Sequence, residues 1–257
     1  MAATLNNTLL PEGADTKSTS GIHVLIVGAG FGGLTAAIEC RRKGHSVMLL
    51  ESFSELRPLG DIISFGANGS RIFSRWDGII DKLETICHQA DRIAYYDYRG
   101  KHIYTQVWAE GREWGRKLDG HRGEIHEVVW NYALQLGVDI RLGQRVDEYF
   151  ETDSEAGVIV NGDRIVADVV IAADGVRSTA RKIVLGYDDK PKSSGYAVYR
   201  AWFSAENIRK NPRTAWLCET GDKHVAWLGP DVHFIVATVK NASDVSWVMT
   251  HKVRDIH

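Results

Sequence analysis

Short apolar runs, glycine-rich turns and one helical stretch alternate in a regular order near the N-terminus. Residues 22–27 form a run rich in β-branched side chains that leads directly into the turn GAGFGG at residues 28–33. Residues 34–43 then carry good helix formers up to Gly44, and residues 46–50 form a second apolar run that ends at Glu51. This order predicts a βαβ unit, in which a strand, a helix and a second parallel strand follow one another.

The glycines and the acid of this unit each have a physical task. Gly28 allows the tight turn out of the strand, Gly30 lets a pyrophosphate approach the backbone, and Gly33 lets the helix pack closely on the sheet. The helix N-terminus favours an anion. Glu51 can accept hydrogen bonds from a ribose diol and would repel a 2′-phosphate, which favours FAD or NAD over NADP. A glycine-rich turn alone is a weak signal, but here the strands and helix that it requires surround it.

A second helical pattern lies near the middle of the chain. Apolar residues recur at helical spacing between Asp119 and Gly137 and predict an amphipathic helix. Arg122 stands just before this helix, where the helix dipole disfavours a cation. Pairing with a bound pyrophosphate would explain the arginine, and a solvated arginine at a helix start is the alternative.

The segment that follows predicts short strands and a buried strand. Residues 138–142 and 145–150 have strand character, and residues 158–160 and 164–166 are expected to form a hairpin across Asn161-Gly162-Asp163. Residues 166–173 read as a buried strand that ends in Asp174-Gly175. An Asp-Gly pair after a strand is by itself only a turn signal.

From Lys192 onward the pattern has a period of two residues. Residues 195–203, 225–228 and 233–239 predict strands of an antiparallel sheet that could form an apolar pocket wall. Arg200 is a cation in the middle of an aromatic strand, and strand alternation sends its neighbour Tyr199 to the opposite face. A surface-facing Arg200 is the alternative to a functional one.

Composition narrows the function classes. The chain has 44% hydrophobic residues, enough to bury a substantial core, and 31 Lys+Arg balance 33 Asp+Glu, which disfavours nucleic-acid or anionic-membrane binding. Its three cysteines form no CxxC pair, so we expect neither a metal site nor a redox dithiol, but an intracellular protein. Residues 1–20 predict a mobile tail, and no apolar stretch is long enough to span a bilayer.

Together, these motifs resemble the group A FAD-dependent monooxygenases, and in particular the salicylate-hydroxylase-like fungal members. The motifs that carry the resemblance are GAGFGG, the distant Glu51, Arg122 before a helix, and DVVIAADGVRS at residues 168–178. The resemblance implies an α/β fold in which a Rossmann-like, glutathione-reductase-like FAD-binding βαβ domain is interleaved with a mainly antiparallel β-sheet substrate region. We expect the FAD-binding domain at residues 21–190 and an incomplete substrate-domain portion at residues 191–257.

The resemblance also implies roles for individual residues. Arg122 would contact the FAD phosphates, Asp174 would lie near the ribityl chain, and Arg200 would be a catalytic residue over the substrate that stabilises a phenolate. The segment that begins at Gly60 would lie beside the flavin, although it lacks a glycine at Ile62 and a proline before Asn68. The expected cofactor contacts are Gly28, Gly30, Phe31, Gly33, Glu51, Gly60, Arg122, Val146 and Asp174.

The implied reaction is hydroxylation or epoxidation of a hydrophobic aromatic or conjugated small molecule, with O₂ and a transiently bound NAD(P)H. An FAD oxidase or dehydrogenase would share the first βαβ unit, but the Arg122 and Asp174 motifs disfavour it. Family members continue into a Gly-Asp element that is not found before His257. The chain is therefore expected to be a fragment or a shortened relative, and the alternative is an impaired FAD-binding or interaction protein. A homodimer could compensate for the missing element.

Overall fold

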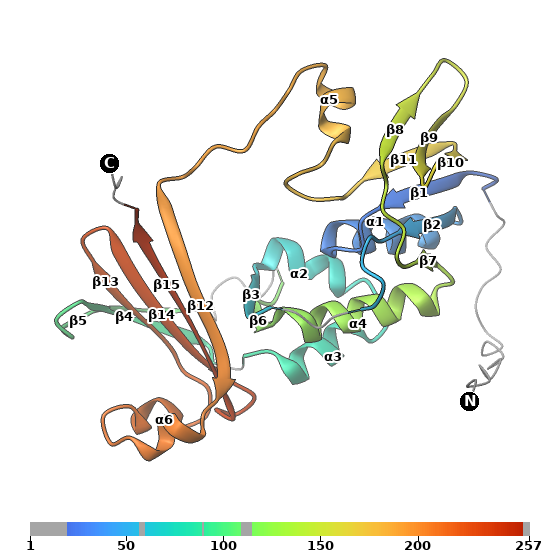
Figure 1. The fold of residues 1–257 in the computed structure, drawn as a ribbon. Coiled ribbons are helices and arrows are strands. Elements are labelled where there is room, and N and C mark those ends of the chain that lie inside the picture. Colours follow the sequence, from blue (N-terminus) through green and yellow to red (C-terminus); the bar gives the residue numbers. More distant parts are fainter. Residues whose placement is uncertain (1–19, 57–59, 89, 109–114, 254–257) are drawn as a thin grey trace, which may run out of the picture.

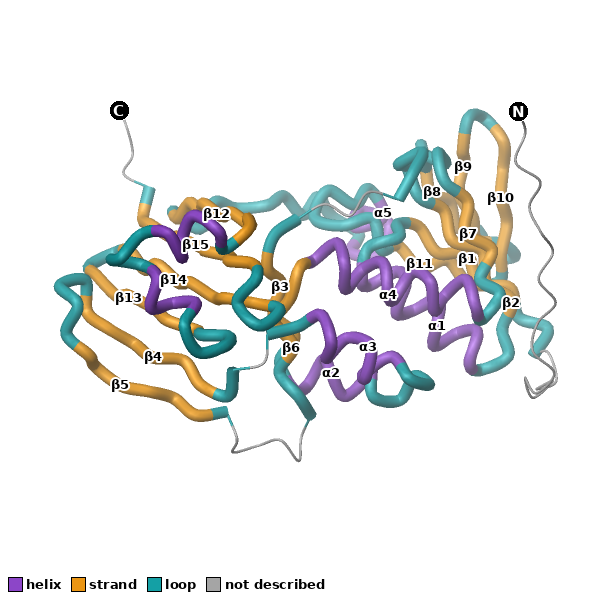
Figure 2. The backbone as a smooth tube through the Cα atoms, turned by 90° about the horizontal axis from the view of Figure 1, so that it is seen from below, coloured by secondary structure: helices purple, strands orange, loops and turns teal. Residues whose placement is uncertain are grey.

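The computed structural model describes residues 20–56, 60–88, 90–108 and 115–253. A Rossmann-like unit and a large, mainly antiparallel sheet lie side by side, with helices and a small two-stranded sheet between them (Figures 1 and 2). The predicted N-terminal tail lies outside the described residues, except for Ser20.

A parallel sheet forms the centre of the Rossmann-like unit. Its order is β11-β1-β2-β7, with the strands β11 Val169–Ala172, β1 His23–Val27, β2 Ser46–Leu50 and β7 Asp139–Arg141. Helix α1, Phe31–Arg42, joins β1 to β2 and packs against α4, Arg122–Gln135, which in turn packs against α3, Ile79–Ile86. The predicted βαβ unit is confirmed. Within the described residues, no helix is both long and apolar enough to cross a membrane.

The second predicted helix is confirmed as α4, and Arg122, expected just before it, is its first residue. Residues Leu118–His121, which precede the helix, form strand β6, which pairs antiparallel with β3, Ile62–Phe65. Helix α2, Ala67–Phe73, follows β3. The sequence pattern did not indicate this pairing, because β3 is distant from β6 in the chain.

A three-stranded sheet packs on the Rossmann-like unit. Its strands are β8 Glu148–Glu151, β9 Ala156–Val160 and β10 Asp163–Ala167. The predicted hairpin is confirmed, with a turn of two residues, Asn161 and Gly162, which have φ values of 53° and 86°. Positive φ at both positions matches the twist of the flanking strands.

The expected buried strand at residues 166–173 was wrong. The chain changes sheets at Asp168, whose carboxylate accepts the backbone N–H of His23 at 2.7 Å, so β10 and β11 belong to different sheets. Strand β11 lies at the edge of the parallel sheet, and Val169 is 45% exposed. An apolar run alone does not show where a strand ends. Helix α5, Ala180–Leu185, follows.

A six-stranded sheet forms the other side of the molecule. In spatial order its strands are β12 Tyr196–Ser204, β15 Asp244–Lys252, β14 Val232–Val239, β13 His224–Gly229, β4 Arg92–Asp97 and β5 His102–Val107. The period-two strands after Lys192 are present. Strands β4 and β5, from the N-terminal part of the chain, join them in this sheet.

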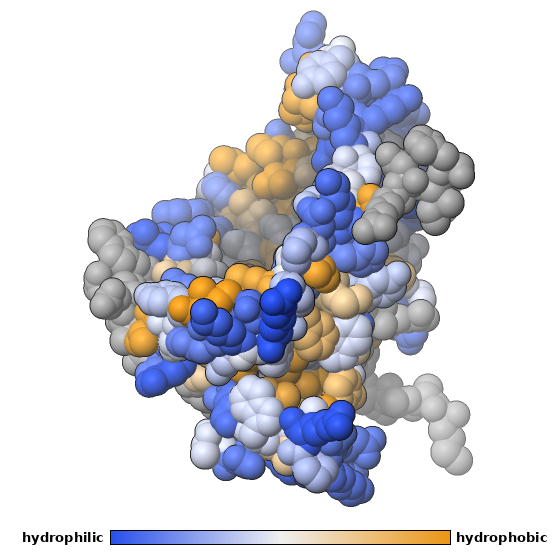
Figure 3. All heavy atoms as spheres, turned by 90° about the vertical axis from the view of Figure 1, so that its left-hand side faces the viewer, coloured by the Kyte–Doolittle hydropathy of each residue, from blue (hydrophilic) through white to orange (hydrophobic). Residues whose placement is uncertain are grey.

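This large sheet is only partly covered. Helix α6, Glu206–Lys210, and the short 3₁₀ helix η2, Ala215–Cys218, pack against each other and beside the sheet's apolar cluster. Other apolar side chains of the sheet stay exposed, among them Tyr104, Val198 and Leu228. Figure 3 shows apolar patches between polar ones on this side of the molecule.

A buried polar cluster joins the large sheet to β6. His224 on β13 is 8% exposed at its side chain, and its Nδ1 lies 3.9 Å from Oδ2 of Asp119. The Lys117 ammonium binds the same carboxylate and lies 4.0 Å from the centre of the Trp108 ring. Burial, followed by the nearby Lys117, lowers the pKa of His224 to about 3. His224 is therefore neutral in the folded protein at ordinary pH.

We expect this histidine to make folding stability fall on acidification. An unfolded histidine binds a proton below a pKa of about 6.5, whereas folded His224 binds it only near pH 3. Between these values, the free energy of unfolding should lose up to about 1.4 kcal/mol per pH unit from this group. Urea unfolding at pH 7.5 and pH 5 should show a smaller loss for His224→Gln than for the wild type, and an unchanged loss for the exposed control His102→Gln. An equal loss in all three proteins would contradict the assignment.

Candidate functional site

The N-terminus of α1 opens beside the carboxyl ends of β1 and β2. Gly28 has a φ of +99° and donates its N–H to the Leu50 carbonyl at 2.8 Å, which turns the chain sharply after β1. Gly30 is the N-cap of α1, no side chain caps the helix, and its first turn holds no acidic residue. The free N–H groups and the positive end of the helix dipole therefore remain available to an anion.

The three glycines of the motif differ in what surrounds them. A Cβ on Gly33 would lie 1.9 Å from the Gly28 carbonyl oxygen, and one on Gly28 would lie 2.5 Å from the Ala173 carbonyl oxygen. A Cβ on Gly30 would meet no atom within 4 Å. The fold itself thus requires Gly28 and Gly33, whereas Gly30 borders open space.

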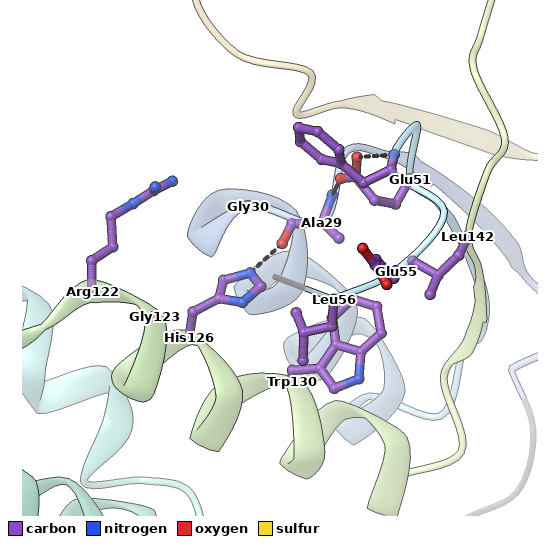
Figure 4. A pocket seen from close by; sticks show the side chains of 11 residues that line it. Ala29, Gly30, Glu51, Glu55, Leu56, Arg122, Gly123, His126, Trp130 and Leu142 are labelled. Carbon is purple, nitrogen blue, oxygen red and sulfur yellow. Dashed lines mark hydrogen bonds between the residues drawn. The ribbon is translucent and has the colours of Figure 1, made fainter. Parts of the chain in front are cut away.

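A cavity of about 140 Å³ lies at this turn. Figure 4 shows its side chains converging from the glycine-rich turn, the loop after β2 and helix α4. Arg122, His126 and Trp130 are four residues apart, so they share one face of α4. The lining residues are Ala29, Gly30, Glu51, Phe53, Glu55, Leu56, Arg122, Gly123, His126, Trp130 and Leu142.

Glu51 forms hydrogen bonds with both the glycine-rich turn and the loop after β2 at the cavity. Its Oε2 accepts the N–H of Ala29 at 2.8 Å, and its Oε1 accepts the N–H of Phe53 at 2.9 Å and the hydroxyl of Ser52 at 3.0 Å. A carboxylate has about four acceptor sites, so Glu51 keeps capacity for a further hydrogen bond. The sequence indicated an acceptor here, but it did not indicate that the same carboxylate holds the turn.

His126 is a site residue that the sequence analysis missed. Its Nε2 donates a hydrogen bond to the Ala29 carbonyl at 2.6 Å, and its ring meets the Phe31 ring edge-on at 5.4 Å. Phe31 also packs against Phe65, so its side chain forms part of the apolar wall behind the turn. The spacing of four residues from Arg122 was the signal that could have identified His126.

Arg122 is the first residue of α4 and is exposed. Within the described parts of the chain, its guanidinium has no ion-pair partner. Gly60 has a φ of +130°, and a Cβ there would lie 3.0 Å from Cβ of Arg122. The backbone N–H of Arg122 donates to the Asp61 carbonyl at 2.8 Å. The structure thus brings together the two predicted residues Gly60 and Arg122.

Asp174 follows β11 and lies next to the glycine-rich turn. A Cβ on Gly28 would be 3.1 Å from Cα of Asp174. Oδ1 of Asp174 is buried, and burial followed by a hydrogen bond with Asp174 raises the pKa of Tyr149. A carboxylate has about four acceptor sites, so Asp174 keeps capacity to accept a further hydrogen bond from a ligand.

Among the predicted residues, Gly30, Glu51 and Arg122 line the cavity, whereas Val146 and Arg200 belong to other parts of the structure. Val146 packs in the apolar cluster that contains Leu25 and Val27, and it is not among the lining residues. Arg200 lies on β12, where its Nη1 donates to Oδ1 of Asp61 at 3.2 Å. Tyr199 faces the opposite side, as predicted, and stacks on His251 there. Among the described residues, the ion pair with Asp61 connects Arg200 to the cofactor side.

These features define a dinucleotide-binding protein of Rossmann-like fold with an attached antiparallel sheet. A family model described as an NAD(P)-binding Rossmann-like domain matches residues 26–72. The chain is 38% identical to asperlicin C monooxygenase of Petromyces alliaceus, over 96% of this chain and 54% of that protein. It is 37% identical to the FAD-dependent monooxygenase okaB of Penicillium ochrochloron, over 93% of this chain and 55% of that protein.

Solved structures give the same result. The crystal structure of CtdE in complex with FAD and substrate 4 matches with a TM-score of 0.85 at 37% identity, over 91% of this chain and 58% of that chain. The crystal structure of native FqzB matches with a TM-score of 0.81 at 34% identity, over 94% and 55%. The chain spans about half the length of the curated relatives that it matches. Over most of its own length, it is homologous to fungal FAD-dependent monooxygenases.

The close approach at Gly33 leads to a stability prediction. Gly33→Ala should lower the free energy of unfolding by roughly 3 kcal/mol, because the new methyl group would overlap the Gly28 carbonyl. Gly32→Ala is the matched control, since it lies in the same helical turn with no atom within 4 Å of its Cβ. That change should be neutral or stabilising by up to about 1 kcal/mol. Equal urea midpoints for the two variants would show that the helix does not depend on this contact.

Proposed function

We propose that the protein binds FAD and works as a monooxygenase that hydroxylates or epoxidises a hydrophobic aromatic or conjugated small molecule. The observation that carries the proposal is the likeness to FAD-dependent monooxygenases along most of this chain, including a structure that holds FAD and a substrate. O₂ and NAD(P)H are the proposed co-substrates. Because NAD(P)H is found inside cells, we expect an enzyme that uses it to work there.

The residues at the glycine-rich turn fit the ADP half of FAD. The uncapped start of α1 offers N–H groups to the pyrophosphate, and the open side of Gly30 leaves room for it. Arg122 supplies a cation without an ion pair among the described residues. Glu51 lines the same cavity and can accept a hydrogen bond from the ribose. The N–H donors and the Arg122 cation thus match the negative pyrophosphate, and the Glu51 acceptor matches the ribose hydroxyls.

Other residues would orient the remaining parts of the cofactor. Asp174 lies next to the turn, and its carboxylate can accept a hydrogen bond from a ribityl hydroxyl. The segment at Gly60 packs on Arg122 and is our proposed neighbour of the flavin. FAD, when bound, supplies the oxygen chemistry, and the protein contributes binding, orientation and exclusion of water.

Arg200 is our proposed contact to the substrate. It lies on the face of β12 that meets Asp61 and, through Trp202, the ring of His121. A guanidinium there can donate hydrogen bonds to a substrate oxygen and stabilise partial negative charge that develops on it. Because the chain carries one GxGxxG motif, NAD(P)H would bind only transiently, as a reductant.

The cofactor assignment predicts that Gly30→Val abolishes FAD binding while the fold remains intact. The backbone of Gly30 has a φ of −69°, which valine tolerates, and the side chain would enter the space left for the pyrophosphate. FAD affinity, measured by quenching of flavin fluorescence, should fall at least about tenfold. Gly32→Ala should bind FAD like the wild type. Unchanged FAD affinity in a folded Gly30→Val protein would contradict the site.

The reaction is tested on the FAD-loaded protein with a panel of neutral aromatic compounds. NADH and NADPH oxidation, peroxide formation and incorporation of ¹⁸O from ¹⁸O₂ into product are measured together. A labelled product supports a monooxygenase. FAD binding with neither product nor substrate-dependent NAD(P)H oxidation would instead indicate a binding protein, against this proposal.

A further inference from the structure

An ion pair joins the large sheet to the start of the cofactor-side helix. Nη1 of Arg200 on β12 lies 3.2 Å from Oδ1 of Asp61, in the loop before β3. The Asp61 side chain is 22% exposed and that of Arg200 is 48% exposed. Solvent therefore reaches the arginine more than the carboxylate that holds it.

The backbone of Asp61 is fixed on the cofactor side. Its carbonyl accepts the N–H of Arg122, the first residue of α4, and the next residue, Ile62, pairs with His121 across β3 and β6. Gly60, on its other side, packs against the Arg122 side chain. Since its main chain is held at three points, Asp61 can direct the more exposed Arg200 side chain.

The face of the sheet around Arg200 carries apolar side chains next to the polar Thr250 and Ser246. In register, Arg200 lies beside Val248 of β15, and Val248 lies beside Ile235 of β14. Two residues away along β12 on the same face are Val198, 46% exposed, and Trp202. The guanidinium of Arg200, whose charge Asp61 offsets, thus lies among apolar side chains that can pack against an aromatic ligand.

We propose that Asp61 is a positioning and specificity residue for the substrate face. By pairing with Arg200 it directs the guanidinium and offsets its charge, so that the site takes neutral aromatic compounds with a hydrogen-bond acceptor and rejects carboxylates. A carboxylate at Arg200 would lie next to the Asp61 carboxylate and be repelled. A neutral carbonyl can accept one of the guanidinium N–H groups that Asp61 leaves free. This inference rests on the proposed function, because it takes the Arg200 face as the substrate site.

The test compares two ligands of nearly equal shape, 2-naphthoate and 2-naphthamide. Their affinities for wild type and Asp61→Asn are measured by calorimetry, with and without FAD. The wild type should bind the amide more tightly. Asp61→Asn should bind the carboxylate about fivefold more tightly than the wild type does, with amide affinity changed less than twofold. Asp139→Asn, which removes the acid of the exposed Asp139–Arg141 pair, is the matched control and should change neither affinity.

Two more variants separate positioning from general disruption. Asp61→Glu should keep the preference for the amide, and Asp61→Asn/Arg200→Gln should lose the gain in carboxylate affinity. The proposal is overturned if folded Asp61→Asn binds the carboxylate no better than the wild type, including no binding at all, or if the double variant keeps the gain. Because ligand binding without FAD is measured separately, failure of FAD to bind would count against the proposed function alone.

Discussion

Helix α1 crosses the first turn so closely that no side chain fits between them at Gly33. That contact fixes the distance and direction of the helix relative to β1, so its N-terminus points at the ends of β1 and β2. Glu51 reaches the turn from the end of β2, and His126 reaches it from α4. The cavity, the position of the α1 N-terminus and the placement of Glu51 beside it all depend on this close contact between the backbones at Gly33 and Gly28.

Helix α4 connects the glycine-rich turn to the large sheet. Its inner face lines the cavity, and its first residue is hydrogen-bonded to the loop whose carboxylate holds Arg200. A shift of α4 would thus move both the glycine-rich turn and the loop that holds Arg200. In the function that we propose, this connection links the cofactor side of the molecule to the substrate side.

The sequence predicted those elements that depend on interactions between residues close together in the chain. The βαβ unit follows from periodicity and glycine, and the hairpin at Asn161-Gly162 follows from turn chemistry. Pairings between distant segments were missed: β6 pairs with β3 just before α4, and β4 pairs with β13 and extends the large sheet. The break between β10 and β11 occurs at Asp168, which is hydrogen-bonded to His23. Because His23 lies 145 positions earlier in the chain, the sequence near residue 168 does not indicate this bond. In the site, Gly28, Gly30, Glu51, Arg122 and Asp174 lie around one turn as expected, whereas His126 and the partner of Arg200 depend on tertiary contacts.

The order of strands in the large sheet has a consequence for how the chain folds during synthesis. Strands β4 and β5 form an antiparallel hairpin, but the neighbour of β4 in the sheet is β13, which it meets in parallel. At typical elongation rates of roughly 5–20 residues per second, the hairpin waits on the order of ten seconds for β13 to leave the ribosome. During that time β4 presents an unpaired edge, and Ile103 and Tyr104 of β5 are exposed apolar residues even in the finished fold. The nascent chain is thus expected to need protection from aggregation most while residues 108–224 are being made.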